Sequence, residues 1–454
     1  MDTSAKWRNH VVQAQIDRCL AFEDHIVSLR RREYAHALPP AILDFLDRAS
    51  LHVRRRLRRL RGDPDFNALS DSEAQTQISR YLDFYQWMYV AASLVERVGA
   101  GDGLVELYMP LRRILTRALG ETDILLLPIP SVNYSLLAVG DGLRIVSKTV
   151  GLPEAALGVL GGQVYAVGFP GLQSGHFLGQ CLLGHEAGHA MYDPLGLDNV
   201  LLPLIQKDEE RLEELARSIA TGMPADMRIG EVQIRASLAT AITTAVERWV
   251  MEIACDTIGY ALFGPAFVLS ALQFLPLLGP LDDSTDEYPP NRMRLHLLFN
   301  LLDDSGLRYP RVRAFLRAWR DVASFDKIEW SIPWHELAGE SIMSASAEIS
   351  SATLENVEAK LGVFDYRGQV DYIDQLVQRM RQGVPPNEVV TGGTPVTASL
   401  PCIMNAGWFS MFSVLQATMR EHQWTEREAK DRMNRLVAKA VELGEVQTRW
   451  QEVQ

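Results

Sequence analysis

The sequence predicts a mainly α-helical protein of the α+β class, with one small mixed β-sheet in its central part. Apolar residues recur at three- and four-residue spacing through long segments near both ends of the chain, which is typical of amphipathic helices. Between about residues 122 and 169 the pattern changes to short apolar runs bounded by Pro, Asn and Gly, which is typical of strands. With 454 residues, 47% of them apolar and 22% charged, the composition is that of an ordinary globular protein with two or three domains.

The N-terminal region, residues 1–120, is expected to consist of helices. The helical spacing occupies four segments: 11–30, 40–61, 73–98 and 104–118. Proline and glycine residues separate them. The second segment contains the run Arg54–Arg61, six arginines in eight positions. This run predicts either a solvated helix face or a docking patch for an acidic partner.

The central region, residues 121–300, is expected to hold the sheet. The predicted strands are 124–129, 134–139, 143–147 and 163–169. The predicted helices are 175–192, 205–221 and 231–262. The segment Ile258–Leu281 contains no charged residue, but Gly264-Pro265 and further glycines and prolines interrupt it. These interruptions favour a buried core helix, broken at Gly264, over a membrane-spanning segment.

The C-terminal region, residues 301–454, is expected to be helical, with one flexible connector at 391–399. The four cysteines are scattered without a CxxC pair, which fits a reducing compartment. The first residues lack the apolar run of a signal peptide, so a cytoplasmic location is expected. A net charge of −12 makes nucleic acid an unexpected partner, and a membrane is not expected either.

The segment His185-Glu-Ala-Gly-His189 carries the strongest chemical signal. Positions i and i+4 of a helix share a face about 6 Å apart along the axis, so the two imidazoles can hold one metal ion. Glu186 lies beside them as a base for the water that the metal activates. Uncharged neighbours predict a buried helix. Gly188 costs a helix about 1 kcal/mol relative to alanine, so we expect another segment to approach the backbone there.

Two histidines do not complete a catalytic zinc site, which generally has three protein ligands. Glu252 and Asp256 are again i and i+4 among apolar neighbours, so Glu252 is the expected third ligand and Asp256 the carboxylate that orients an imidazole. Glu247 is the competing ligand, and an internal salt bridge is the alternative role of the Glu252 and Asp256 pair. Asp193 continues the stripe of 185 and 189 but would lie about 12 Å along the axis from His185, too far for one helix to bring all three onto one ion. His176, His296 and His335 are possible ligands without a supporting pattern.

HExxH followed about sixty residues later by ExxxD resembles the gluzincin metallopeptidases. The long gap is most similar to the CAAX-prenyl-endopeptidase and HtpX-like branch, which also carries a His-Pro-x4-Arg segment. Here Tyr288-Pro-Pro-Asn-Arg-Met-Arg294 has the proline and the arginine, with tyrosine in the place of histidine. The resemblance covers roughly 120–300. The paired membrane helices of that branch are not evident, so a soluble relative is expected.

The resemblance implies a zincin-like metallopeptidase core that binds Zn²⁺. It implies these roles: His185, His189 and Glu252 as ligands, Glu186 as base, and Asp256 behind the ligands. In this interpretation Tyr288 or Arg294 stabilises the oxyanion of the reaction. The predicted strand Gln163–Phe169 precedes the HExxH helix and is expected to be an edge strand that pairs with the extended substrate, or else an ordinary internal strand.

The expected function is hydrolysis of peptide bonds in a protein or peptide substrate by a zinc endopeptidase. The alternative is a zinc-containing binding or regulatory protein that retains the fold without turnover, which the large helical flanks permit. A zinc amidase acting on a non-peptide bond is a third interpretation. Glu186 favours an enzyme, because a purely structural site needs no base. A regulatory partner is a further expectation, with Arg54–Arg61 receiving an acidic protein or the chain's own segment Asp208–Glu214.

Overall fold

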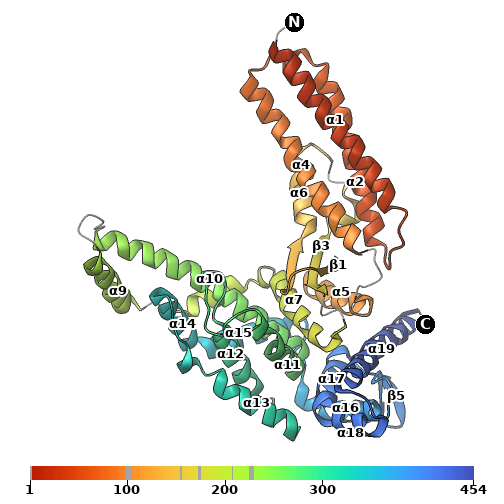
Figure 1. The fold of residues 1–454 in the computed structure, drawn as a ribbon, viewed down its shortest axis with the longest axis vertical. Coiled ribbons are helices and arrows are strands. Elements are labelled where there is room, and N and C mark those ends of the chain that lie inside the picture. Colours follow the sequence, from red (N-terminus) through yellow and green to blue (C-terminus); the bar gives the residue numbers. More distant parts are fainter. Residues whose placement is uncertain are drawn as a thin grey trace. The chain divides into compact units, whose positions relative to one another are not determined.

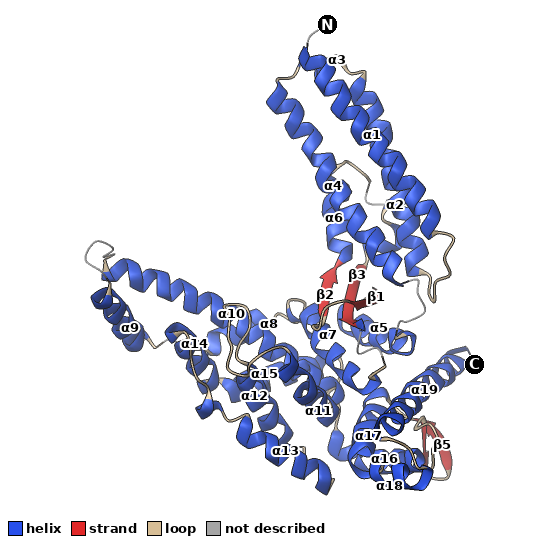
Figure 2. Ribbon diagram, viewed as in Figure 1, coloured by secondary structure: helices blue, strands red, loops and turns tan. Residues whose placement is uncertain are grey.

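The computed structural model describes residues 3–98, 104–153, 156–171, 175–206, 208–223, 230–303 and 305–453. In these ranges the protein is mainly helical, with a small mixed sheet and a two-stranded hairpin (Figures 1 and 2). The predicted mainly helical class is therefore confirmed.

The chain divides into two compact units. The first comprises 1–108, 119–131 and 135–171, and the second comprises 109–118, 132–134 and 172–454. The sheet thus belongs to the same unit as the N-terminal helices. The division into three regions, with boundaries at 120 and 300, stays a prediction, because contacts within one folded chain do not test which parts fold independently.

The first unit packs long helices against the sheet. Its elements are α1 (Thr3–Leu29), α2 (Leu38–Arg61), α3 (Pro64–Ala68), α4 (Asp71–Val98), β1 (Thr122–Ile129), β2 (Ser135–Ala138), α6 (Val139–Thr149), η2 (Gly158–Gly161) and β3 (Gln163–Pro170). Phe22, Phe45 and Phe84 form the centre of its core, which continues to Leu125 of β1 and Val164 of β3. The four predicted N-terminal helices correspond to α1, α2, α4 and α5 (Val105–Leu119), of which α5 contributes 109–118 to the second unit.

The sheet has the order β1-β3-β2, with β1 parallel and β2 antiparallel to β3. Thr122 pairs with Gln163, and Ser135 pairs with Gly168. The strand Gln163–Pro170 therefore has partners on both sides. The prediction that it is an edge strand is wrong, and the alternative of an internal strand is confirmed.

The prediction of a strand at 143–147 is wrong, because these residues belong to helix α6. Val139, Leu143 and Val150 are buried at helical spacing, together with Ser147, whose hydroxyl donates to the Leu143 carbonyl. A four-residue apolar period over eleven residues outweighs the local β-propensity of one Ile-Val pair.

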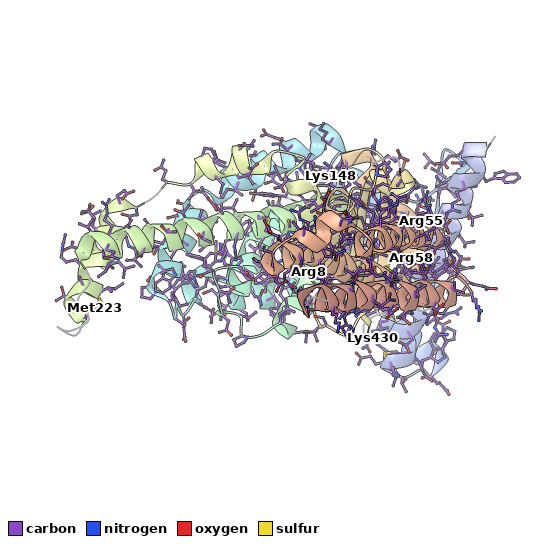
Figure 3. The ribbon with its side chains drawn as sticks, turned by 90° about the horizontal axis from the view of Figure 1, so that it is seen from above. Arg8, Arg55, Arg58, Lys148, Met223 and Lys430 are labelled. Carbon is purple, nitrogen blue, oxygen red and sulfur yellow. The ribbon has the colours of Figure 1, made fainter. Side chains whose placement is uncertain are left out.

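The arginine run of α2 is partly used inside the first unit. Arg54 pairs with Glu23 at 3.0 Å, and Arg56 donates to the Val150 carbonyl. Arg55 and Arg58 are exposed (Figure 3), and no carboxylate of the described residues lies within ion-pair distance of them. For these two side chains, the predicted solvated face and the predicted docking patch both stay predictions.

The second unit is organised around α10 (Glu231–Phe263), a 33-residue helix (Figure 1). Before α10 come η4 (Phe177–Leu182), α7 (Leu183–Tyr192), α8 (Leu197–Leu201), η5 (Leu202–Leu204) and α9 (Glu209–Gly222). After it come α11 (Pro265–Phe274), η7 (Leu275–Leu277), α12 (Asn291–Asp303), α13 (Pro310–Val322), η8 (Phe325–Lys327), α14 (Pro333–Ser344), α15 (Ser346–Lys360), α16 (Tyr366–Arg381), β4 (Glu388–Thr391), β5 (Thr394–Thr397), α17 (Leu400–Ser413), α18 (Leu415–His422) and α19 (Glu426–Val453).

The uncharged segment is a broken core helix, as the sequence predicts. Gly264 separates α10 from α11 at φ +58°, a conformation that favours glycine. Asn405 of α17 is fully buried at this break; its amide oxygen accepts from the Ala266 N–H at 3.0 Å, and its amide nitrogen donates to the Phe263 carbonyl at 2.8 Å. One side chain thus satisfies backbone groups on both sides of the break. None of the helices in the described ranges combines the length and apolar character needed to cross a bilayer.

Residues 391–399 are not simply a flexible connector, because they include most of a hairpin. β4 and β5 are antiparallel, with Thr391 opposite Thr394. The two residues between them, Gly392 and Gly393, both have positive φ, which a two-residue hairpin turn requires. The Gly-Gly pair therefore acts as a turn signal.

In the same unit, the acidic segment of α9 is engaged locally, since Arg235 pairs with Glu209 and Glu213.

Candidate metal centre

The candidate site begins with a close approach of α7 to α10. A Cβ atom on Gly188 would lie 2.8 Å from the Cα of Cys255, and one on Gly184 would lie 3.1 Å from the Cα of Gly259. Two glycines one turn apart therefore let the two backbones come nearly into contact. The close approach expected at Gly188 is confirmed, and it carries the imidazoles of α7 towards the carboxylates of α10.

Three side chains from these helices converge. The Nε2 atoms of His185 and His189 are 3.1 Å apart, and the Glu252 carboxylate lies 3.3 Å from the first and 3.4 Å from the second. Among the described residues these three form the only group of potential metal ligands of this kind. The structure thus brings together the three ligands expected from the sequence.

The donor set fits a metal ion. In a tetrahedral zinc site with bonds of about 2.0–2.1 Å, neighbouring ligand atoms are about 3.3 Å apart. The contacts of 3.3 and 3.4 Å use the two different oxygens of Glu252, and one ligand atom from each of the three side chains lies within 4.8 Å of the others, which is close enough to share one ion. Two imidazoles and one carboxylate would also leave a fourth position open, as catalytic sites do.

A buried charge network orients the first ligand. The His185 Nδ1 lies 2.9 Å from the Asp256 carboxylate, which in turn accepts from Arg294 at 2.7 and 2.8 Å. This is the arrangement that fixes an imidazole with its Nε2 towards a metal. Asp256 therefore has the predicted orienting position.

Arg294, one of the two residues predicted for the oxyanion, is engaged by buried carboxylates. Its guanidinium is occupied by Asp256, lies 3.6 Å from Glu252, and is buried. A group that stabilises an oxyanion must instead point at the reacting carbonyl. Arg294 is a positioning residue, because it holds the carboxylate that orients His185.

The two imidazoles differ in protonation state, and this affects metal binding. Burial, assisted by the charge of His185, lowers the pKa of His189 to about 4, so this imidazole is neutral and free to act as a ligand. Burial also opposes a charge on His185, but its contacts with Asp256 and Glu252 outweigh burial and raise its pKa to about 10. In the metal-free protein His185 therefore carries a proton that lies among the carboxylates. A metal ion would have to replace this proton in order to bind.

Glu186 lies on α7 and is not a ligand. Burial raises its pKa to about 7. Only 6% of Glu186 is exposed, and in the described part of the chain no donor lies within hydrogen-bond distance of its carboxylate. A buried carboxyl group with a pKa near neutrality and no structural partner is suited to accept and return a proton.

Tyr288 lies on a loop between η7 and α12 that neighbouring helices hold in place. Burial, together with the nearby charge of Glu252, raises the pKa of its hydroxyl. His335 of α14, fully buried, bonds to the Ser284 hydroxyl at 2.8 Å and to the Asp286 carboxylate at 3.0 Å. Trp249 of α10 donates to the Thr285 carbonyl at 2.9 Å. The loop of Tyr288 is therefore anchored on both α10 and α14, and the oxyanion role of Tyr288 stays a prediction.

The other ligand candidates lie outside the cluster. Glu247 and Asp193 are exposed. The His176 Nδ1 accepts from the Gly179 N–H at the start of η4, and the His335 ring holds the Tyr288 loop. His296 contacts the Phe325 ring. The role of His335 was missed because its partners, Ser284 and Asp286, lie about fifty residues earlier in the chain. The sequence around His335 at the start of α14 does not indicate these partners.

Comparison with known proteins gave no match: no family model, no curated protein and no solved structure shows significant similarity to this chain. The functional conclusion therefore rests on the site itself.

Replacing Gly188 by alanine is expected to weaken metal binding by at least about tenfold. The added methyl would lie 2.8 Å from a backbone atom of α10, so the helices must separate and the ligand atoms with them; overpacking of this kind costs about 1–3 kcal/mol. Chelator competition measures the affinity. Gly222→Ala in α9, where nothing lies within 4 Å of an added Cβ, is the control and should leave affinity unchanged. Equal affinities of the two variants would contradict the close-approach interpretation.

Replacing His335 by alanine is expected to loosen the Tyr288 loop. Two hydrogen bonds from a fully buried ring are lost, worth about 1 kcal/mol each. Amide hydrogen exchange across 281–290 should therefore quicken by about tenfold or more. His335→Gln, which can keep one of the bonds, should restore part of the protection. Unchanged exchange in the alanine variant would show that Trp249 alone holds the loop.

Proposed function

We propose that this protein is a zinc-dependent endopeptidase with a zincin-like core, in which His185, His189 and Glu252 hold the metal. The observation that carries the proposal is the combination of three converging ligand atoms with the unpartnered, buried carboxyl group of Glu186 on the same helix. A purely structural site has no use for such a group. The gluzincin-like spacing of HExxH and ExxxD supports the same conclusion.

The chemistry divides between the metal and the chain. His185, His189 and Glu252 would hold a zinc ion, which would supply Lewis-acid chemistry to the carbonyl and the attacking water. Glu186 takes the proton of the attacking water and returns it to the departing amine; a pKa of about 7 suits both transfers at neutral pH. Asp256 and Arg294 keep His185 in the required tautomer and orientation. The Tyr288 hydroxyl is the proposed donor to the oxyanion.

Metal analysis combined with a cleavage assay tests the proposal. We expect about one zinc per chain, and cleavage of a mixed peptide library that stops on chelation and returns with zinc. Glu252→Gln should lose the metal and the activity together. Zinc bound without cleavage of any peptide or protein would favour the non-proteolytic regulatory alternative, and hydrolysis confined to non-peptide amides would favour an amidase. Absence of metal binding would overturn the proposal.

The peptide substrate and a regulatory protein partner belong to the same proposal. So does a cytoplasmic location, which the scattered buried cysteines fit: Cys19, Cys181, Cys255 and Cys402 are all free thiols. Comparing proteins cleaved in cells by the wild type with those left intact by the Glu186→Gln variant would identify the substrates.

A further inference from the structure

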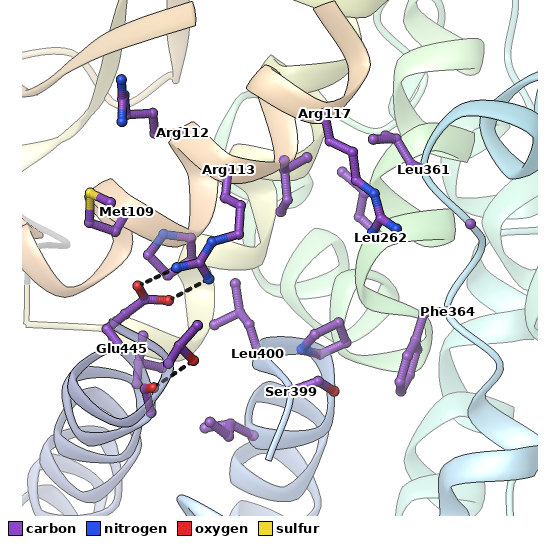
Figure 4. Close-up of a pocket in the computed structure, with 18 of the residues that line it drawn as sticks. Met109, Arg112, Arg113, Arg117, Leu262, Leu361, Phe364, Ser399, Leu400 and Glu445 are labelled. Carbon is purple, nitrogen blue, oxygen red and sulfur yellow. Dashed lines mark hydrogen bonds and ion pairs between the residues drawn. The ribbon is translucent and has the colours of Figure 1, made fainter. Parts of the chain in front are cut away.

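The second unit contains a cavity of about 880 Å³ whose lining includes none of the candidate metal ligands (Figure 4). Its walls come from α5, the end of α10, the segment Leu361–Phe364, the start of α17, and α19. This volume lies within the range of about 300–1,000 Å³ that is usual for small-molecule sites. The cavity is large enough for a ligand and has no role in the proposed reaction.

Much of the cavity wall is apolar. Leu262, Ile403 and Val441 form buried parts of it, and Leu361 and Phe364 are half-buried beside them. Leu262 and Phe364 lie on the same side of the cavity in the close-up (Figure 4). Covering apolar surface of this kind gains about 25 cal/mol per Å², so an apolar group bound here is stabilised.

The charged groups of the wall are unequally satisfied. Arg113 of α5 forms a two-pronged ion pair with Glu445 of α19, at 3.1 and 3.0 Å. Arg117, one turn further along α5, extends beside Leu262 (Figure 4), and no carboxylate of the described chain lies within ion-pair distance of it. Of the three arginines that line the cavity, Arg112 and Arg113 have partners, and Arg117, an exposed residue, has no carboxylate partner among the described residues.

The free guanidinium indicates the charge of the ligand. Guanidinium groups bind carboxylates in a planar, two-pronged geometry. Two acids also line the cavity: Glu445 is already neutralised, and Glu452 lies seven residues further along α19, about 10 Å along its axis. A multiply charged anion such as a phosphate ester would face these acids, whereas a single carboxylate matches one free cation.

We propose that this cavity binds a small amphipathic carboxylate, whose acid group pairs with Arg117 and whose apolar part covers Leu262, Leu361 and Phe364. The ligand class follows from the cavity volume, the apolar wall and the single unpaired cation. The proposal does not depend on the metal centre, because the two sites share no residue. Binding should accordingly be equal in metal-loaded and chelator-treated protein.

Titration of the full-length protein with octanoate, followed by NMR or calorimetry, tests the site. We expect saturable binding of one octanoate, weakened about tenfold by Arg117→Gln and partly retained by Arg117→Lys. Octanol, which has the same tail without the charge, should bind about tenfold more weakly than octanoate. Arg381→Gln, at an exposed arginine of α16 that lines no part of the cavity, is the matched control and should bind like the wild type.

Two further results decide the case. Ile114→Trp, which places a bulky ring on the cavity wall, should abolish octanoate binding while the melting temperature stays near that of the wild type. Equal affinity for octanoate and octanol, or unchanged affinity in Arg117→Gln, would overturn the carboxylate assignment. Absence of saturable binding, or saturable binding that Ile114→Trp leaves intact in a folded protein, would overturn the site.

Discussion

Replacing Glu186 by glutamine is expected to lower peptide hydrolysis by about two to four orders of magnitude and to leave the metal content unchanged. Glutamine keeps the size of the side chain but cannot take a proton, and general-base catalysis contributes about 10²–10⁴-fold. Glu186 is not among the three converging ligands, so the metal should be held as before. The measurements are kcat/KM on a peptide substrate and zinc per chain by elemental analysis.

Two glutamate variants of α10 serve as controls for this experiment. Glu247→Gln changes an exposed residue outside the cluster and should alter neither activity nor zinc content. Glu252→Gln replaces a ligand and should lower both. A Glu186→Gln protein that binds zinc and still cleaves at close to the wild-type rate would show that another group moves the proton, and the proposed mechanism would then be wrong.

The ligand set was accessible to sequence reasoning because its spacing is that of a helix. His185 with His189, and Glu252 with Asp256, are i and i+4 pairs, and a helix puts such pairs on one face whatever surrounds it. The glycine between the histidines predicted the close approach of another segment, which the structure shows to be α10 at Cys255. Local geometry therefore determined most of the site.

The parts that the sequence did not reveal depend on contacts between distant segments. Nothing in Gln163–Pro170 itself shows that β2 and β1 pair on its two sides. Arg294 was one of two candidates for the oxyanion, and nothing in its own segment shows that the buried carboxylate of Asp256, 38 residues earlier, binds it. The partners of Asn405 at the α10–α11 break lie about 140 residues away. Tertiary partners of polar side chains leave no periodic trace in a sequence.

Replacing Arg294 by methionine is expected to destabilise the metal-free protein by about 3–5 kcal/mol, because it leaves a buried carboxylate without its main counter-charge. Asp256 is 5% exposed and accepts two of its hydrogen bonds from Arg294. Urea unfolding in the presence of a chelator measures the loss. Arg292→Met, on the same helix, removes a pair with Asp282 that is nearer the surface, and should cost about 1 kcal/mol.

A second substitution separates charge from packing. Asp256→Asn added to Arg294→Met removes the unpaired charge and retains a group that can bond to His185, so the double variant should be more stable than Arg294→Met alone. If the large loss reflected only the missing arginine side chain as packing material, the double variant would be no more stable than the single one.

The pH dependence of stability gives an independent test of whether Arg294 acts through the charge of Asp256. Burial opposes ionisation of Asp256, but Arg294 and His185 outweigh burial and hold its pKa well below the ordinary value. In the wild type, ionised Asp256 therefore stabilises the fold at pH above its unfolded pKa of about 3.9, and this contribution is lost as the pH falls towards the folded pKa. Without Arg294, burial raises the pKa of Asp256, and protonation then removes the buried charge. The destabilisation of Arg294→Met relative to the wild type should therefore shrink as the pH is lowered from 7 towards 5. A difference in stability that stays constant over this range would mean that Arg294 does not act through the charge of Asp256.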